Sequence, residues 1–148
     1  TFWPTFKGRD GCRTPMPWKD APDAGFSPVQ PWLPVPDEHR ALAVERQEAD
    51  PDSVLHAFRA FMRWRKQQPA LVRGSIRFLD TAEPVLAFVR EHEGHRMLAA
   101  FNLSANAATL SLPDGQWQPQ AIPGYAAVGI DGGQATLPAW GVLFALAG

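Results

Sequence analysis

The opening of the chain is broken by prolines, and this constrains its fold more than any other feature. Residues 4–36 contain eight prolines. A proline fixes φ and removes a backbone donor, so each one excludes a helix interior or a central strand at its position. The same segment is rich in large apolar residues: Phe2, Trp3, Phe6, Trp18, Phe26, Trp32 and Leu33. Disordered segments lack such residues. We therefore predict that residues 1–49 form an irregular, ordered loop packed on another part of the protein.

One helix is expected over residues 50–70. Asp50 is suited to be its N-cap, and Pro51 suits the first helical position. Pro69 is expected to end the helix. Apolar residues recur along the segment at helical spacing: Val54, Leu55, Phe58, Phe61 and Met62. The basic residues in its second half suit the negative end of the helix dipole.

Residues 71–148 consist of short apolar runs between turn signals, which predicts an antiparallel β-sandwich. The clearest pair is a hairpin in which the turn 92–95 joins runs 85–91 and 96–103. That turn contains His92 and His95, but beside Gly94 a polar turn is favoured over a metal site. The other expected strands are 76–79, 108–112, 126–130, 134–137 and 142–147.

Charge and cysteine content exclude several classes of protein. The formal net charge is −1, so no broad field favours nucleic acid or an anionic membrane. No apolar run reaches the roughly 20 residues that span a bilayer. Cys12 is the only cysteine, which excludes an intrachain disulfide and is compatible with a cytoplasmic location. We interpret the start at Thr1, without Met, as a position inside a longer protein.

A series of sequence blocks then follows in a specific order. The first block is Gly8–Trp18, which contains Arg9-Asp10-Gly11-Cys12-Arg13-Thr14-Pro15. The later blocks stand at 24–27, 31–35, 44–47, 50–55 and 65–71. Together they resemble the α-glucosidase and oligo-1,6-glucosidase group of glycoside hydrolase family 13. The resemblance implies an α+β fragment that contains the end of a (β/α)8 barrel. In that arrangement, residues 1–49 would be the last loop of the barrel and residues 50–70 its last helix. Residues 71–148 would form an antiparallel β-sandwich domain.

The resemblance also implies an activity. Such enzymes are exo-acting and retaining, and they act on the terminal α-linked glucose of oligosaccharides or sucrose-like sugars. Retention needs two carboxyl groups about 5–5.5 Å apart. In the family these groups lie in earlier motifs that do not occur here, so no catalytic residue is assigned and this chain alone is expected to be inactive. No cofactor or metal is implied. The implied partners are the sugar substrate and an N-terminal barrel of the same protein, with no nucleic acid and no membrane.

Arg13 is the main candidate for substrate binding. The resemblance places it beside the non-reducing-end glucose, paired with an upstream aspartate, where a planar guanidinium binds a carboxylate with two prongs. The alternative is that Arg13 only ties its loop to the barrel. Arg9 and Asp10 are further candidates, with a local ion pair or turn cap as their alternative. Trp18, Trp32 and Phe26 are candidates for stacking on sugar or for packing.

A second hypothesis is a carbohydrate-binding or purely structural β-sandwich module without catalysis. The strand-rich second half and the surplus of aromatic residues motivate it. The long opening loop and the helix with one apolar face argue against it, because a module that functions alone has no use for them. Gly11-Cys12 and Pro17 depart from the residues frequent in the family, which indicates a subgroup with a different loop.

Overall fold

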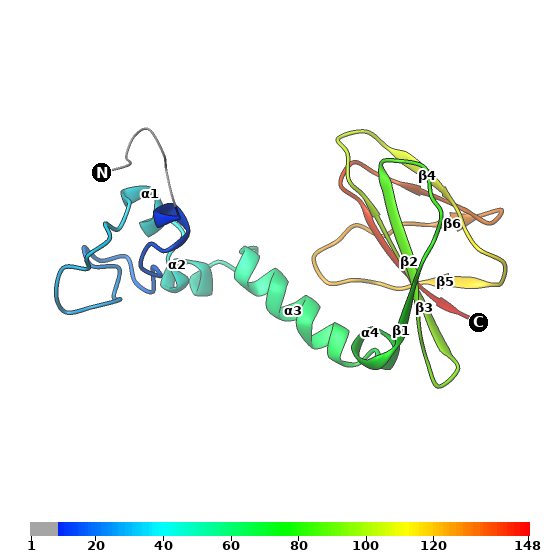
Figure 1. Cartoon of the computed structure of the whole chain (residues 1–148), viewed down its shortest axis with the longest axis horizontal. Coiled ribbons are helices and arrows are strands. Elements are labelled where there is room, and N and C mark those ends of the chain that lie inside the picture. The colour runs from blue at the N-terminus through cyan, green and yellow to red at the C-terminus, as the bar shows by residue number, and fades with distance from the viewer. Residues whose placement is uncertain (1–8) are drawn as a thin grey trace. The chain divides into compact units, whose positions relative to one another are not determined.

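The computed structural model describes residues 9–148, which divide into two compact units at residues 58 and 59 (Figure 1). Three aromatic residues of the predicted loop, Phe2, Trp3 and Phe6, lie outside the described residues. None of the helices within residues 9–148 combines the length and the apolar character needed to cross a bilayer.

From Arg9 to Pro36 the first unit is irregular apart from one short 3-10 turn, η1, at Asp10–Cys12. Two short helices then follow, α1 at Asp37–Arg40 and α2 at Val44–Ala49. The prediction of an irregular loop through residue 49 did not include them. Both helices follow the last proline of the segment, Pro36. Pro36 stands at the N-cap of α1, where a proline does not interfere with a helix.

The long helix, α3, spans Val54–Lys66, and the boundary between the two units falls within it. Its N-cap is Ser53, whose Oγ accepts a hydrogen bond from His56 N at 3.3 Å. The prediction of Asp50 as N-cap was wrong. Asp50 closes the preceding turn instead, because its Oδ1 accepts from Asp52 N at 3.0 Å. Helix α3 ends three residues before Pro69, and Pro69 opens a further helix, α4, at Pro69–Arg73.

The second unit is a sandwich of two antiparallel sheets. A five-stranded sheet has the order β1-β2-β3-β8-β5, and a three-stranded sheet has the order β4-β7-β6. The strands are β1 Ser75–Phe78, β2 Val85–His92, β3 His95–Asn102, β4 Ala108–Ser111, β5 Trp117–Pro119, β6 Ile130–Asp131, β7 Gln134–Leu137 and β8 Val142–Ala147. The predicted fold class, the end of a barrel domain followed by an antiparallel β-sandwich, is confirmed.

The predicted hairpin is present as β2 and β3. His92 pairs with His95, which leaves Glu93 and Gly94 as a two-residue loop. Both loop residues have positive φ, 49° and 80°, as a type I′ turn requires. The two histidines therefore flank a turn. Within residues 9–148, no three His, Cys, Asp or Glu side chains gather where a metal ion could be held.

Two predicted features of the sandwich were wrong in detail. Of the expected strand 126–130, only Ile130 is in a strand, as the first residue of the two-residue β6, Ile130–Asp131. Strand β5 was missed, because three residues are too few to show an alternating pattern. Pro119 in β5 has no backbone donor, and β5 lies at the edge of its sheet, where this is tolerated.

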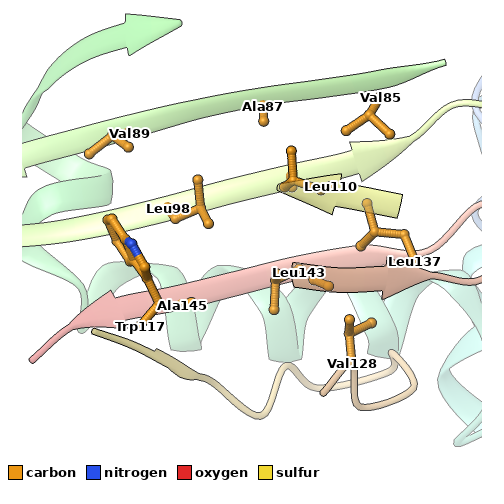
Figure 2. Packing of buried hydrophobic residues seen from close by; sticks show 12 residues of the cluster. Val85, Ala87, Val89, Leu98, Leu110, Trp117, Val128, Leu137, Leu143 and Ala145 are labelled. Carbon is orange, nitrogen blue, oxygen red and sulfur yellow. The ribbon is translucent and has the colours of Figure 1, made fainter. Parts of the chain in front are cut away.

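The main core lies between the two sheets. Figure 2 shows Val85, Ala87 and Val89 of β2 on the same face as Leu98 of β3, close to Leu110 and Leu137 of the smaller sheet. Alternation along β2 buries every second residue in this core and turns Phe88 to the opposite face.

A second core covers that opposite face of the larger sheet. At its centre is Phe144 of β8, which is 4% exposed. Its ring centroid lies 5.2 Å from that of Trp64, 6.0 Å from Phe61 and 5.9 Å from Phe101. Aromatic rings at such separations attract one another beyond the effect of their buried area. The second half of α3 is thus fixed to the sheet by Phe61 and Trp64.

One polar side chain, Asn102, is buried at the corner where β3 ends, and it is 2% exposed. Its Nδ2 donates to the carbonyls of Asn106 at 2.6 Å and Pro138 at 2.8 Å. Its Oδ1 accepts from Ser104 N at 3.2 Å and from Ser104 Oγ at 3.0 Å. The desolvation cost of the amide is therefore offset by hydrogen bonds on both of its ends.

Candidate substrate-binding site

The three candidate residues of the first block lie on one short turn. Cys12 N donates to Arg9 O, and Arg13 N donates to Asp10 O, both at 3.0 Å, which closes η1. Asp10 and Arg13 are three residues apart, the spacing at which side chains of a 3-10 turn lie on the same side. The side chains of Arg9, Asp10 and Arg13 are all exposed.

The guanidinium of Arg13 has no hydrogen-bonding or ion-pairing partner among residues 9–148. It is therefore available to a carboxylate or a sugar hydroxyl from elsewhere. The next residue ties the turn to its own unit, because Thr14 Oγ1 lies 3.4 Å from Nδ1 of His39 on α1. Arg13 thus projects from a turn that is anchored directly behind it.

An acid that is not among the predicted site residues, Asp20, organises this unit. Its carboxylate accepts hydrogen bonds from Nε of Arg46, at 3.0 Å, and from Nη2 of the same guanidinium. Arg40 Nη2 lies 3.4 Å from its other oxygen. Two backbone hydrogen bonds run alongside, from Val44 N to Pro17 O and from Glu45 N to Trp18 O. The segment after the Arg13 turn is thereby fastened to α2.

The Asp20 cluster should make the first unit sensitive to acid. The hydrogen bond from Arg46 is the main influence that holds the pKa of Asp20 below its ordinary value of 3.8, and the charge of Arg40 adds to it. Because the pKa is lower in the folded state, the stabilisation is complete above pH 3.8 and is lost as the pH falls through the folded pKa. Amide exchange at Val44 and Glu45, corrected for intrinsic rates, should accelerate as the pH falls below about 4.

Asp20→Asn is the control for this prediction. The variant keeps the shape of the side chain but has no titratable group at this position. Its amides should exchange faster at neutral pH and show little further change on acidification. An acid response equal to that of the wild type would contradict the role given to Asp20.

The three aromatic candidates for sugar stacking are all exposed in the first unit. Trp18 is 51% exposed, Phe26 53% and Trp32 85%. Of the three, Trp32 lines a cavity, together with Asp23 and Gln30. For all three rings, the choice between stacking on sugar and packing stays a prediction.

The comparisons with known proteins divide the chain later than the two compact units do, just after helix α4. Residues 2–74 match the alpha amylase catalytic domain, and residues 76–143 match the maltogenic amylase C-terminal domain. The change from one match to the other coincides with the start of β1 at Ser75.

The matching proteins are much longer than this chain. A probable alpha-glucosidase of Rhizobium meliloti (strain 1021) is 47% identical over 97% of this chain and 26% of its own length. The crystal structure of an alpha-glucosyl transfer enzyme, XgtA, superposes with a TM-score of 0.91 at 57% identity, over 100% of this chain and 28% of that one. Trehalulose synthase MutB from Pseudomonas mesoacidophila MX-45 superposes with a TM-score of 0.79 at 30% identity, over 95% of this chain and 26% of that one. The chain thus spans about a quarter of the length of these relatives.

Proposed function

This chain belongs to glycoside hydrolase family 13, in the group of α-glucosidases and oligo-1,6-glucosidases, and from that membership we propose that it is the C-terminal part of an exo-acting α-glucosidase. The proposed enzyme acts on the terminal α-linked glucose of oligosaccharides or sucrose-like sugars and retains the anomeric configuration. The observation that carries the proposal is the two-part match, to the catalytic domain up to residue 74 and to a C-terminal domain after it.

In this proposal the chain supplies binding and support, and the preceding part of the protein supplies the reacting groups. The two carboxyl groups of the retaining mechanism belong to the N-terminal barrel. Arg13 pairs with an aspartate of that barrel and closes the pocket beyond the terminal glucose. Its exposed guanidinium, unpartnered within residues 9–148, supports this role. Arg9 and Asp10, on the same turn, line the pocket beside it.

The same proposal gives each segment a place in the enzyme. Residues 1–49 cover the C-terminal face of the barrel, where the active sites of such barrels lie. Helix α3, at Val54–Lys66, is the last barrel helix, and the strands from β1 onward form the domain that follows. The exposed side chains of Val54 and Phe58 on α3 support a helix that packs against a further part of the protein.

We further propose a cytoplasmic enzyme whose partners are its own barrel and an oligosaccharide or disaccharide. The single, exposed thiol of Cys12 supports a reducing compartment. The near-zero net charge supports a protein that binds neither nucleic acid nor membrane.

Expression of the complete coding sequence that contains this chain tests the proposal. Purified protein should release glucose from p-nitrophenyl α-glucoside, maltose, isomaltose or sucrose, with the α-anomer as the first product seen by NMR. Inactivity on all of these substrates would refute it. Maltose binding by residues 71–148 alone, in a protein without glucosidase activity, would instead support the β-sandwich module.

A further inference from the structure

The segment that comes soon after η1, residues 14–20, is held at both of its ends by α1. At the first end, Thr14 Oγ1 lies 3.4 Å from Nδ1 of His39. At the second end, Nη2 of Arg40 lies 3.4 Å from a carboxylate oxygen of Asp20. His39 and Arg40 are successive residues of α1. One short helix therefore determines where the segment begins and where it ends.

The middle of the same segment is bound to the start of α2. Val44 N donates to Pro17 O at 2.9 Å, and Glu45 N donates to Trp18 O at 3.0 Å. The first amides of a helix have no acceptor inside the helix. The N-cap residue of α2 is Ala43, whose methyl group cannot accept a hydrogen bond. The carbonyls of the segment therefore take the place of a capping side chain, and the segment is fixed along its length.

Arg13 stands directly before this segment, and its own side chain does not fix its direction. The guanidinium is exposed and has no hydrogen-bonding or ion-pairing partner among residues 9–148. The backbone on its two sides is what directs it. On one side Arg13 N donates to Asp10 O at 3.0 Å, and on the other Thr14 contacts His39. An arginine side chain is long, so a small rotation of this backbone moves the guanidinium further than it moves Cα.

The contact between Thr14 and His39 can form with either arrangement of hydrogens on the ring. When Nδ1 carries no hydrogen, it accepts from the Thr14 hydroxyl, and when Nδ1 carries one, it donates to Oγ1. Both side chains belong to residues that are half-buried. The contact is thus a lasting tie between α1 and the residue next to Arg13.

We propose that Thr14 and His39 are positioning residues, which act on the substrate only through Arg13. They hold the backbone beside Arg13 so that its guanidinium reaches the barrel aspartate and the terminal glucose in one direction. Neither residue touches the substrate in this account. The inference rests on the proposed function, in which Arg13 closes the pocket. A misplacement of about 1 Å can lower an enzymatic rate on the order of 100-fold, so a partial loss of this tie should be measurable.

A double-mutant cycle in the full-length enzyme tests the inference. Thr14→Val keeps the shape of the side chain and removes the hydroxyl. It should lower kcat/KM on p-nitrophenyl α-glucoside about threefold to tenfold, the effect of one lost hydrogen bond. In the Arg13→Ala background the same change should alter kcat/KM less than about twofold, because no guanidinium remains to be positioned. Thr14→Ser keeps the hydroxyl and should retain most of the wild-type kcat/KM.

His39→Phe tests the other partner of the contact. It removes Nδ1 and should lower kcat/KM by about the same factor as Thr14→Val. The variant that carries both changes should be no worse than either single variant, because the two changes remove the same hydrogen bond. Should Thr14→Val fail to fold, His39→Phe with and without Arg13→Ala decides the question by the same comparison.

Thr109→Val is the matched control, because Thr109 is exposed on β4 in the second unit. It should leave kcat/KM unchanged. An unchanged kcat/KM in Thr14→Val, or an equal loss with and without the Arg13 guanidinium, would overturn the inference while the proposed function stands. The second of these results would show that Thr14 only stabilises the fold. A fully active Arg13→Ala variant would remove the role of Arg13 in the pocket and the inference with it.

Discussion

Replacing Phe144 with alanine should lower the free energy of unfolding of the second unit by about 3–5 kcal/mol. Phe144 is nearly fully buried, and its ring contacts the rings of Phe61, Trp64 and Phe101. The substitution removes a large apolar side chain and leaves a cavity between α3 and the sheet, which aromatic side chains on both sides are too rigid to fill. The same change releases α3 from its main contact with β8.

Hydrogen exchange of the amides in β3 and β8 measures this effect within the second unit. A loss of 3–5 kcal/mol corresponds to protection factors lower by more than about a hundredfold. The control is Phe78→Ala in β1, since Phe78 is 61% exposed and contacts one ring, that of Phe88. This substitution should lower the free energy of unfolding by less than about 1 kcal/mol. Equal losses for the two variants would show that the second core does not stabilise the sheet.

Replacing Arg13 with alanine should reduce kcat/KM of the full-length enzyme on p-nitrophenyl α-glucoside by at least about 30-fold, or 2 kcal/mol. The reason is that the aspartate with which Arg13 is proposed to pair would be left without its partner in a desolvated pocket. Arg13→Lys should recover little of the loss, because an ammonium group cannot make the planar, two-pronged contact.

The control for Arg13 is an arginine in the other unit. Arg77 is exposed on the edge strand β1 and should tolerate replacement by alanine with kcat/KM unchanged. Thermal unfolding of both variants separates a loss of binding from a loss of fold. A fully active Arg13→Ala variant would show that Arg13 has no part in the pocket, and full recovery by Arg13→Lys would argue against a two-pronged contact.

The predicted elements that the structure confirms are those encoded by neighbouring residues. The hairpin of β2 and β3 follows from two apolar runs around Glu93 and Gly94, and both residues take the positive φ that the short loop needs. Strand β5 could not be predicted in this way, because three residues pair with β8 only through tertiary contacts. The prediction of the start of α3 was wrong for another reason. Asp50 and Ser53 are both good caps, and only the fold decides between them.

The candidate site was predictable to a smaller extent. Arg9, Asp10 and Arg13 came from a family resemblance, and the structure adds that they share one exposed turn. The contact of Asp20 with Arg46 joins residues 26 positions apart, so no local pattern indicates it. The cavity at Trp32 depends on how a segment rich in prolines bends back on itself, and residue spacing does not reveal such a path. The groups that would act on a substrate lie, in the proposed enzyme, outside these 148 residues.

The buried amide of Asn102 has a consequence for the way in which the sandwich comes apart. Asn102 ends a strand of the larger sheet, while two carbonyls near its Nδ2, those of Leu137 and Pro138, lie at the end of β7 in the smaller one. Sliding one sheet past the other while the corner stays closed would leave these polar groups buried without hydrogen-bonding partners. The two sheets should therefore melt in a single cooperative step, and a slip of β3 by one residue would break these hydrogen bonds as well as turn its core side chains outward.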